Sequence, residues 1–293
     1  MNRRKSAGIF NVFNVIFLAL VAATCIIPFV NIIAISFSEN SAVSANYVKL
    51  WPVKFTTYAY EYIINSWTFW RAFFVSIERV LLGGFINMVL IILTAYPLSK
   101  EKEHFKYRTA YAWYFFFTML FSGGLIPSYA LMYQLKLLDT LWALVLPTAL
   151  PVFNLVLMLN FFRQIPRELE EAAYMDGAKH VRVLVSIYVP CALPAIATIG
   201  LFTIVGHWNA WFDGLIFMNN ASNYPLQSYL QTVIKGMSFA KSVSTGDFDK
   251  LQLLSDRTLK AAQIIIAVIP VLLVYPFLQR YFVSGIVLGS VKG

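Results

Sequence analysis

Several side chains able to bind a ligand lie within or beside long apolar stretches of this chain. Ionisable groups are costly in such surroundings, so each is a candidate for function. Tryptophan rings stack on the C–H faces of a polyhydroxylated ligand, and carboxylate or amide groups bind its hydroxyls. The candidates are Glu78, Arg79, Tyr129, His207, Trp208, Asn209, Trp211 and Asp213. Two structural alternatives stay open: the tryptophans also suit an aromatic belt at a membrane surface, and Glu78 and Arg79 also suit an ion-pair network with Arg71.

The sequence contains no recognisable catalytic or metal-binding arrangement. Its two cysteines, Cys25 and Cys191, lie in different apolar stretches and are expected to be small buried hydrophobes. None of the three histidines has a Cys or His at the spacing of metal ligands. No G-x-x-x-x-G-K-[ST] occurs, so a phosphate-binding loop is missing too. We therefore expect no enzyme activity, no metal and no cofactor on this chain.

A second polar cluster, residues 164–190, separates two apolar stretches and contains EAAYMDGAKHVRVLVSIYVP. Pro166 suits a first helical turn, and Glu168, Glu170 and Glu171 suit the positive N-terminal end of that helix. Asp176-Gly177 then predicts a sharp turn, because glycine adopts positive φ without a Cβ penalty. The pattern predicts two short helices joined at Gly177. An ordinary amphipathic connector is the alternative that spacing alone leaves open.

Composition indicates that the rest of the chain lies in a bilayer. The chain is 59% hydrophobic and 13% charged, against about 25% charged for soluble domains. Helices are the expected form, because a backbone in hydrocarbon must satisfy its own hydrogen bonds. Six charge-free stretches have the length that a span requires, about 20 residues: 9–38, 80–99, 109–135, 140–162, 183–212 and 261–279. The prediction is a single membrane domain over residues 1–293.

Basic residues predict the orientation of the spans. Arg3, Arg4 and Lys5 place the N-terminus in the cytoplasm, and the inner segments then carry the larger share of Lys and Arg. The first stretch is too long for a signal peptide and is expected to stay as a helix. Both termini and residues 164–190 are predicted to be cytoplasmic. This bias also accounts for the net charge of +9 without nucleic acid.

The polar cluster resembles, in order and spacing, the coupling loop of bacterial ABC importer permeases. That loop reads Glu-Ala-Ala, then Gly, then Ile-x-Leu-Pro, and the matching residues are Glu171, Ala172, Ala173, Gly177, Ile187 and Pro190, with Val189 in place of Leu. The resemblance extends over nearly the whole chain. The segments FSGGLIPSY (121–129), NFFRQIPRELEEAA (160–173) and IATIGLFTIVGHWNAWF (196–212) are similar to carbohydrate-uptake permeases. More narrowly, they resemble the smaller permease subunit of oligosaccharide and polysaccharide importers, the alginate importer among them.

The resemblance implies an all-α integral membrane protein with six transmembrane helices of the type I ABC importer fold and a cytoplasmic coupling helix. It implies a prokaryotic cytoplasmic membrane as the location. The implied partners are a second, homologous permease, two ATPase subunits that bind ATP and Mg, and an extracytoplasmic solute-binding protein. The implied mechanism is import of an oligosaccharide or polysaccharide by alternating access. The residues implied to contact the ATPase are Arg167, Glu171, Ala172, Asp176, Gly177 and Lys179.

Two outer segments are predicted between the spans. Residues 39–67 are rich in aromatics, which indicates an interfacial belt or a short amphipathic helix. In the long loop 218–260, Leu226, Leu230, Val233 and Met237 share one helical face. That face suits either a lid packed on the chain's own membrane domain or a platform for the solute-binding protein.

Other classes of protein fit the sequence less well. A secondary sugar transporter driven by an ion gradient often carries interrupted helices and intramembrane carboxylates, and Glu78 could be such a carboxylate. However, the sequence shows no evident internal repeat, charges within the spans are few, and residues 164–190 would have no role. An intramembrane enzyme would require a nucleophile–base or metal arrangement, which was not found.

Overall fold

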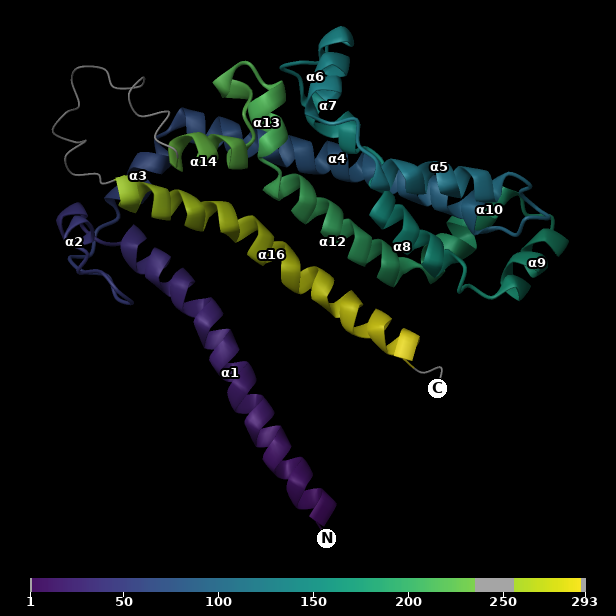
Figure 1. Ribbon diagram of the computed structural model, residues 1–293, viewed down its shortest axis with the longest axis horizontal. Coiled ribbons are helices and arrows are strands. Elements are labelled where there is room, and N and C mark those ends of the chain that lie inside the picture. Colours follow the sequence, from purple (N-terminus) through teal and green to yellow (C-terminus); the bar gives the residue numbers. More distant parts are fainter. Residues whose placement is uncertain (1, 235–255, 291–293) are drawn as a thin grey trace. The chain divides into compact units, whose positions relative to one another are not determined.

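The computed structural model describes residues 2–234 and 256–290, and the regular secondary structure within them is helical (Figure 1). The chain forms two compact units. The first comprises Met1–Trp67 and Leu230–Ile269, and the second comprises Thr68–Tyr229 and Pro270–Gly293. Residues 1, 235–255 and 291–293 lie outside the described part, and with them the middle of the predicted outer loop 218–260, including Met237.

The first unit begins with α1 (Asn2–Ser36), whose residues from Phe10 to Ser36 are apolar enough to cross a membrane. Two short helices follow, α2 (Asn40–Ser44) and α3 (Tyr58–Ile64). Phe37 stacks on Phe55 at 5.4 Å and on Tyr60 at 4.7 Å between ring centroids. The aromatic segment 39–67 therefore contains a short helix, one of the two forms that the sequence predicted.

The second unit contains the other complete helices. The longest is α4 (Trp67–Ser99), which begins well before the charge-free stretch 80–99 that the sequence indicated. The others, in chain order, are α5 (Arg108–Leu120), α6 (Leu125–Gln134), α7 (Leu141–Val145), η1 (Leu146–Thr148), α8 (Val152–Phe162), α9 (Arg167–Met175), α10 (His180–Val183), the π-helix η2 (Leu184–Tyr188), α11 (Val189–Cys191), α12 (Leu193–Asn209), α13 (Phe212–Phe217) and η3 (Ala221–Asn223). Helix α14 (Leu226–Ile234) begins in the second unit and ends in the first. The last helix of the chain, α16 (Asp256–Ser290), runs through both units.

Three of the predicted spans are bent rather than straight. The bends are 110° between α5 and α6, 48° between α7–η1 and α8, and 81° between α10–α11 and α12. Gly124, with φ of 86°, ends the first segment before α6. Prolines stand at the other two breaks, where they remove a backbone donor and clash with the preceding turn. In the described residues, three helices can span a membrane by themselves, and up to six spans result if each bent pair counts as one.

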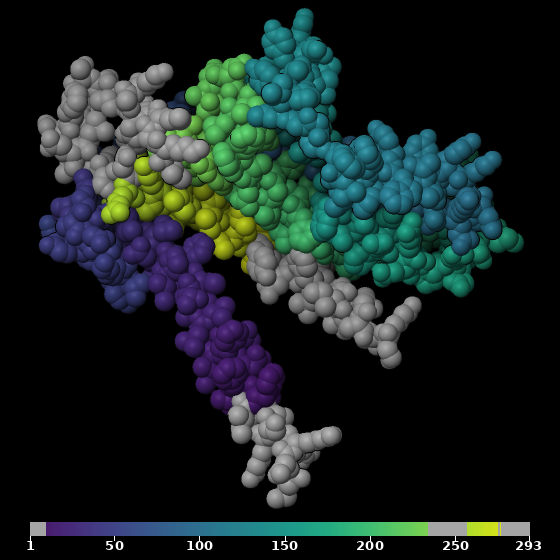
Figure 2. Space-filling view, viewed as in Figure 1, coloured from purple at the N-terminus to yellow at the C-terminus, as the bar shows by residue number. Residues whose placement is uncertain are grey.

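The core of the second unit lies among α4, α8, η2 and α12. Ile91, Leu155, Met158, Phe162 and Ile199 are buried there. Helix α8 packs against both α12 and α5, and Figure 2 shows the α5 residues in blue-teal lying over the greener α8 region. The segments that follow α4 and α8 meet α9 or each other: Lys100 and Glu101 pair with Glu170 and Arg167 of α9, and Arg163 donates to Leu98 O.

The face predicted for the outer loop is buried as far as it is described. Leu226, Leu230 and Val233 are each at most 4% exposed. The backbone N–H of Leu226 donates to Ser76 Oγ on α4 at 2.8 Å. The start of α14 therefore packs on the chain's own membrane domain, as one of the two alternatives predicted.

The prediction that both cysteines are buried is wrong. Cys25 on α1 and Cys191 on α11 are free thiols and exposed. A membrane helix can leave a small apolar side chain on its outer face at no cost, because lipid is as apolar as the core.

Candidate functional site

The segment 164–190 forms two short helices joined by a glycine turn, as the sequence predicted. Helix α9 begins at Arg167 with Pro166 at the N-cap position, and Glu168 and Glu170 lie in its first turn. Gly177 has φ of 77°. Its N–H donates to Tyr174 O at 2.9 Å, and the N–H of Ala178 donates to Ala173 O at 2.9 Å. These two bonds form a Schellman motif, which ends α9 in a fixed geometry before α10.

One side of this helical turn is open to solvent. All six residues that the resemblance implied for ATPase contact are exposed: Arg167, Glu171, Ala172, Asp176, Gly177 and Lys179. Leu169 and Met175, which the sequence reasoning did not single out, are exposed on the same helix, Met175 to 88%. Ala173, Tyr174 and Ala178 are partly buried against the core. A solvated rim with apolar residues at its centre has the composition of a protein-binding surface.

A cluster of Lys100, Glu170, Tyr174 and Tyr188, here called the Glu170 cluster, holds α9 on the rest of the unit. Lys100 Nζ donates to Glu170 Oε1 at 2.6 Å and to the Tyr188 hydroxyl at 2.9 Å. Tyr174 donates to Oε1 at 2.9 Å, and Tyr188 donates to Oε2 at 2.5 Å. Lys100 also lies over the Tyr96 ring at 3.9 Å and the Tyr188 ring at 4.1 Å. The cluster thus joins α9 to the end of α4 and to η2.

The electrostatics of the Glu170 cluster are those of a mostly buried ion pair. The Lys100 and Glu170 side chains are 11% and 14% exposed. Burial raises the pKa of Glu170, but the hydrogen bonds from Lys100, Tyr188 and Tyr174 outweigh it, so the pKa lies below the ordinary value. Burial lowers the pKa of Lys100, and its bond to Glu170 opposes this only in part. The two hydroxyls of Tyr174 and Tyr188 are the further hydrogen-bond partners of this pair within the cluster.

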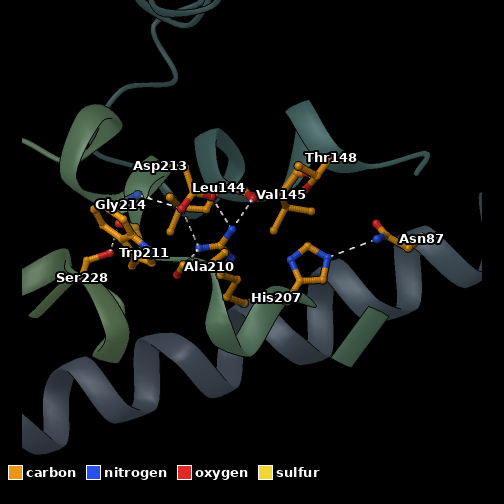
Figure 3. Close-up of polar contacts among 11 residues, drawn as sticks. Asn87, Leu144, Val145, Thr148, His207, Ala210, Trp211, Asp213, Gly214 and Ser228 are labelled. Atoms are coloured by element: carbon orange, nitrogen blue, oxygen red, sulfur yellow. Dashed lines mark hydrogen bonds and ion pairs between the residues drawn. The ribbon is translucent and has the colours of Figure 1, made fainter. Parts of the chain in front are cut away.

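The second group of candidates centres on Arg79, which is 1% exposed on α4. Its guanidinium forms a two-pronged ion pair with Asp213 of α13, one of whose bonds measures 3.1 Å (Figure 3). It also donates to Ala210 O, just after α12, and to Leu144 O in α7, both at 3.4 Å. Arg79 therefore binds carbonyls at the ends of two interrupted helices, where lipid could not satisfy them.

Of the network that was left open as a structural alternative for Glu78 and Arg79 with Arg71, the described residues show a different ion pair, between Arg79 and Asp213. Consecutive residues on a helix point about 100° apart, so Glu78 is exposed while Arg79 is buried. Distance along the chain hid the true pair, because Arg79 and Asp213 are 134 residues apart.

His207 lies next to this pair but makes a different contact. His207, 5% exposed, is 3.2 Å from the Asn87 side chain through Nε2 (Figure 3). Gly83 lies against the imidazole, and a Cβ built there would be 2.6 Å from Nε2. The imidazole therefore fills a fitted space between α4 and α12.

The remaining candidates divide by exposure. Trp208 is 5% exposed and packs edge-to-face on Phe73 at 5.7 Å. Tyr129 is 38% exposed, Asn209 is exposed and Trp211 is partly buried. Among the predicted residues of the described part of the chain, Tyr129, Asn209, Trp211 and Glu78 present surface to a ligand, and Asp213 is partly exposed beside Arg79.

Comparison with known proteins identifies a family and relatives that match this chain over nearly its whole length. Residues 8–287 match the family described as "Binding-protein-dependent transport system inner membrane component". The chain is 40% identical to Protein LplC of Bacillus subtilis (strain 168), over 100% of this chain and 98% of that protein. It is 39% identical to the polygalacturonan/rhamnogalacturonan transport system permease protein YtcP of the same organism, over 94% of this chain and 96% of that protein.

A solved structure is similar over nearly the same length. It is a crystal structure of a bacterial ABC transporter involved in the import of the acidic polysaccharide alginate. The TM-score is 0.86 at 33% identity, covering 94% of this chain and 98% of that chain.

Proposed function

This chain belongs to the family of binding-protein-dependent transport system inner membrane components, and we infer its function from that membership. It is an inner-membrane permease of the sugar ABC transporter kind, with the all-helical fold of that family. We propose that it is the smaller of two permease subunits in an ATP-driven importer of acidic oligosaccharides or polysaccharides. Two relatives support the substrate class, since polygalacturonan and alginate both carry carboxylates on their sugar rings.

The exposed side of α9 is the observation that supports coupling to an ATPase. The Schellman turn at Gly177 and the Glu170 cluster make α9 a rigid projection, so a force on it reaches α4 and η2 directly. We propose that ATP and Mg are bound by separate ATPase chains that contact this surface, and that their closure moves the helices between inward-open and outward-open states. In this proposal the described part of this chain provides the surface that the ATPase contacts, and the ATPase chains carry out the hydrolysis.

An acidic glycan requires compensating charge or donors in the pathway, because an unpaired buried charge costs several kcal/mol. Arg79 does not supply it, since its guanidinium is already neutralised by Asp213. We propose that Arg79 and Asp213 position the interrupted helices, while Asn209 and Trp211 contact the glycan as neutral donors. The remaining positive charge would come from the partner permease.

The test uses the complete transporter, reconstituted with its binding protein. ATPase stimulation and uptake are measured with an oligogalacturonate and with a neutral oligosaccharide of the same length. We expect stimulation by the acidic glycan alone, and a loss in Asn209→Ala and Trp211→Ala. Equal stimulation by the neutral glycan would contradict the substrate class.

The same preparation separates an ATP-driven importer from an ion-gradient transporter. The proposal expects the chain to purify together with an ATPase and to transport nothing by itself. Uptake by this chain alone, abolished by an ionophore, would contradict it.

The orientation is tested separately in intact cells. Cysteines placed at Lys179 and Lys241, in a variant lacking Cys25 and Cys191, are exposed to a membrane-impermeant thiol reagent. We expect labelling at position 241 only. Labelling at position 179 only would reverse the topology.

A further inference from the structure

An apolar groove of about 350 Å³ lies between α5 and α8. Its walls include Trp113, Phe116, Leu155, Val156 and Leu159. Trp113 is 65% exposed and Phe116 is 39% exposed, whereas Leu155 and Leu159 form the buried floor. Both helices belong to bent segments that are apolar enough to span a membrane. The groove therefore presents an apolar surface at the level of the lipid chains.

Two arginines stand together at one end of this groove. Arg108 and Arg163 line both the groove and a second cavity of about 270 Å³ beside α9. Arg108 Nη1 donates to Lys100 O at 2.9 Å, and Arg163 Nη2 donates to Leu98 O at 3.5 Å. Neither arginine forms an ion pair with any carboxylate of the described residues. The buried Arg108 Nε has no hydrogen-bond partner there either.

Three glutamates also line the second cavity, but Glu101 pairs with Arg167 and Glu170 pairs with Lys100, which leaves Glu171. Two further features add positive charge at this end. Helix α5 begins at Arg108 without a side-chain cap and without an acidic residue in its first turn. The positive end of the helix dipole therefore adds to the arginines instead of being neutralised. Burial, and after it the positive charge of Arg108, lower the pKa of the Arg163 guanidinium. An anion between the two side chains would remove this repulsion.

We propose that the groove is a binding site for an anionic phospholipid of the leaflet on the α9 side. Its phosphate would lie between Arg108 and Arg163, and one acyl chain would follow the groove past Trp113. Charge complementarity selects this occupant: a basic site between transmembrane helices suits an anionic headgroup, and the aromatic walls suit a lipid chain. The alternative occupant, an apolar helix of the partner permease, would leave both arginines without an anion.

The site adjoins the Glu170 cluster, which gives the lipid a route to the coupling helix. Arg108 binds the carbonyl of Lys100, and the Lys100 side chain binds Glu170. A bound headgroup would hold the loop between α4 and α5 in place. The inference rests on the membrane location and not on the sugar that is transported.

The experiment measures lipid binding by native mass spectrometry of the whole transporter complex. The complex is released from nanodiscs containing equal amounts of phosphatidylglycerol and phosphatidylcholine, and the ratio of the two retained lipids is compared between variants. Arg108→Gln/Arg163→Gln removes the headgroup site, and Ala112→Phe fills the groove without changing charge. Arg182→Gln removes an exposed charge elsewhere on the same side and is the matched control.

The expected wild-type result is a preference for phosphatidylglycerol. Each arginine is expected to contribute about a fivefold preference, so the double variant should lose about 25-fold. Ala112→Phe should lose the bound lipid as well, while Arg182→Gln should retain it. Size-exclusion chromatography and the unfolding midpoint show which variants remain folded.

Three outcomes would overturn the proposal. The first is a wild type without preference between the lipids, and the second is a preference that survives in the double variant, as it would if the partner permease covered the groove. If Ala112→Phe retains the lipid while the double variant loses it, the arginines bind an anion without using the groove.

Discussion

The substitution Glu170→Gln isolates the ion pair that fastens α9 to the membrane helices. It preserves shape and removes the negative charge that accepts bonds from Lys100, Tyr174 and Tyr188. Lys100, 11% exposed, would then hold its charge without an anion.

The expected loss of stability depends on the contacts that Lys100 keeps in the Glu170→Gln variant. Breaking a buried pair by removing one partner costs about 3–5 kcal/mol. The cation–π contacts to Tyr96 and Tyr188 remain and are worth about 1 kcal/mol or more. We therefore expect a loss of about 2–4 kcal/mol in the free energy of unfolding.

A double-mutant cycle with Lys100→Met measures the pair itself. Because the double variant Lys100→Met/Glu170→Gln leaves no buried charge, it should be more stable than Glu170→Gln alone, with a coupling energy of about 1–2 kcal/mol. Thermal unfolding of the complex in nanodiscs gives the order of stabilities. Substrate-stimulated ATPase activity shows whether α9 still transmits force, and we expect Glu170→Gln to lose stimulation while basal hydrolysis persists.

The pH dependence supplies an independent check. Because the folded pKa of Glu170 is lowered, its contribution is fully present above pH 4.5 and is lost as the pH falls through the folded value. Wild type should therefore lose more stability than Glu170→Gln between pH 4.5 and the folded pKa. Additive effects of the two single substitutions, or identical acid profiles, would refute the reasoning.

Three further substitutions test other contacts. Gly177→Val places a β-branched residue at φ of 77°, which should lower the free energy of unfolding by about 1–2 kcal/mol or more. We expect reduced substrate-stimulated ATPase activity in this variant, whereas Gly177→Asn should be tolerated. Wild-type stimulation in the valine variant would contradict this. Gly83→Ala should lower the free energy of unfolding by about 1–3 kcal/mol, because the new Cβ would lie 2.6 Å from His207. Gly84→Ala is the control, since its Cβ would have no atom within 4 Å and should leave stability unchanged. Equal unfolding midpoints for the two variants would contradict the tight packing of His207 on Gly83. Asp213→Asn leaves the Arg79 guanidinium buried without an anion and should cost about 3–5 kcal/mol, seen as loss of the peak of assembled complex on size-exclusion chromatography; an unchanged peak would rule this out.

Local features of the sequence predicted local structure well. The turn at Gly177 depends on one residue's backbone freedom, and the α9 helix depends on Glu168, Glu170 and neighbouring propensities, so both were readable. The apolar stretches likewise predicted where the membrane segments lie, although not that three of them bend.

Contacts between segments far apart in the chain could not be predicted from the sequence. Arg79 was a candidate for binding substrate until the fold placed Asp213, 134 residues later, against it. The charge-free stretch 80–99 is only the later part of α4, which begins at Trp67 and also contains the charged residues Arg71, Glu78 and Arg79. Glu170 was expected only to favour the helix N-terminus, and its role in the Glu170 cluster depends on Tyr188 in a different helix.

The 134-residue separation of Arg79 and Asp213 has a consequence for the order of synthesis. At about 5–20 residues per second, a ribosome makes Asp213 about 7–27 s after Arg79. During that interval the nascent helix contains an arginine with no counter-ion. The charge-free stretch 80–99 that follows is long enough to cross the bilayer alone. We therefore expect α4 to insert first with Arg79 at the membrane surface, and to move deeper only after Asp213 has left the translocon.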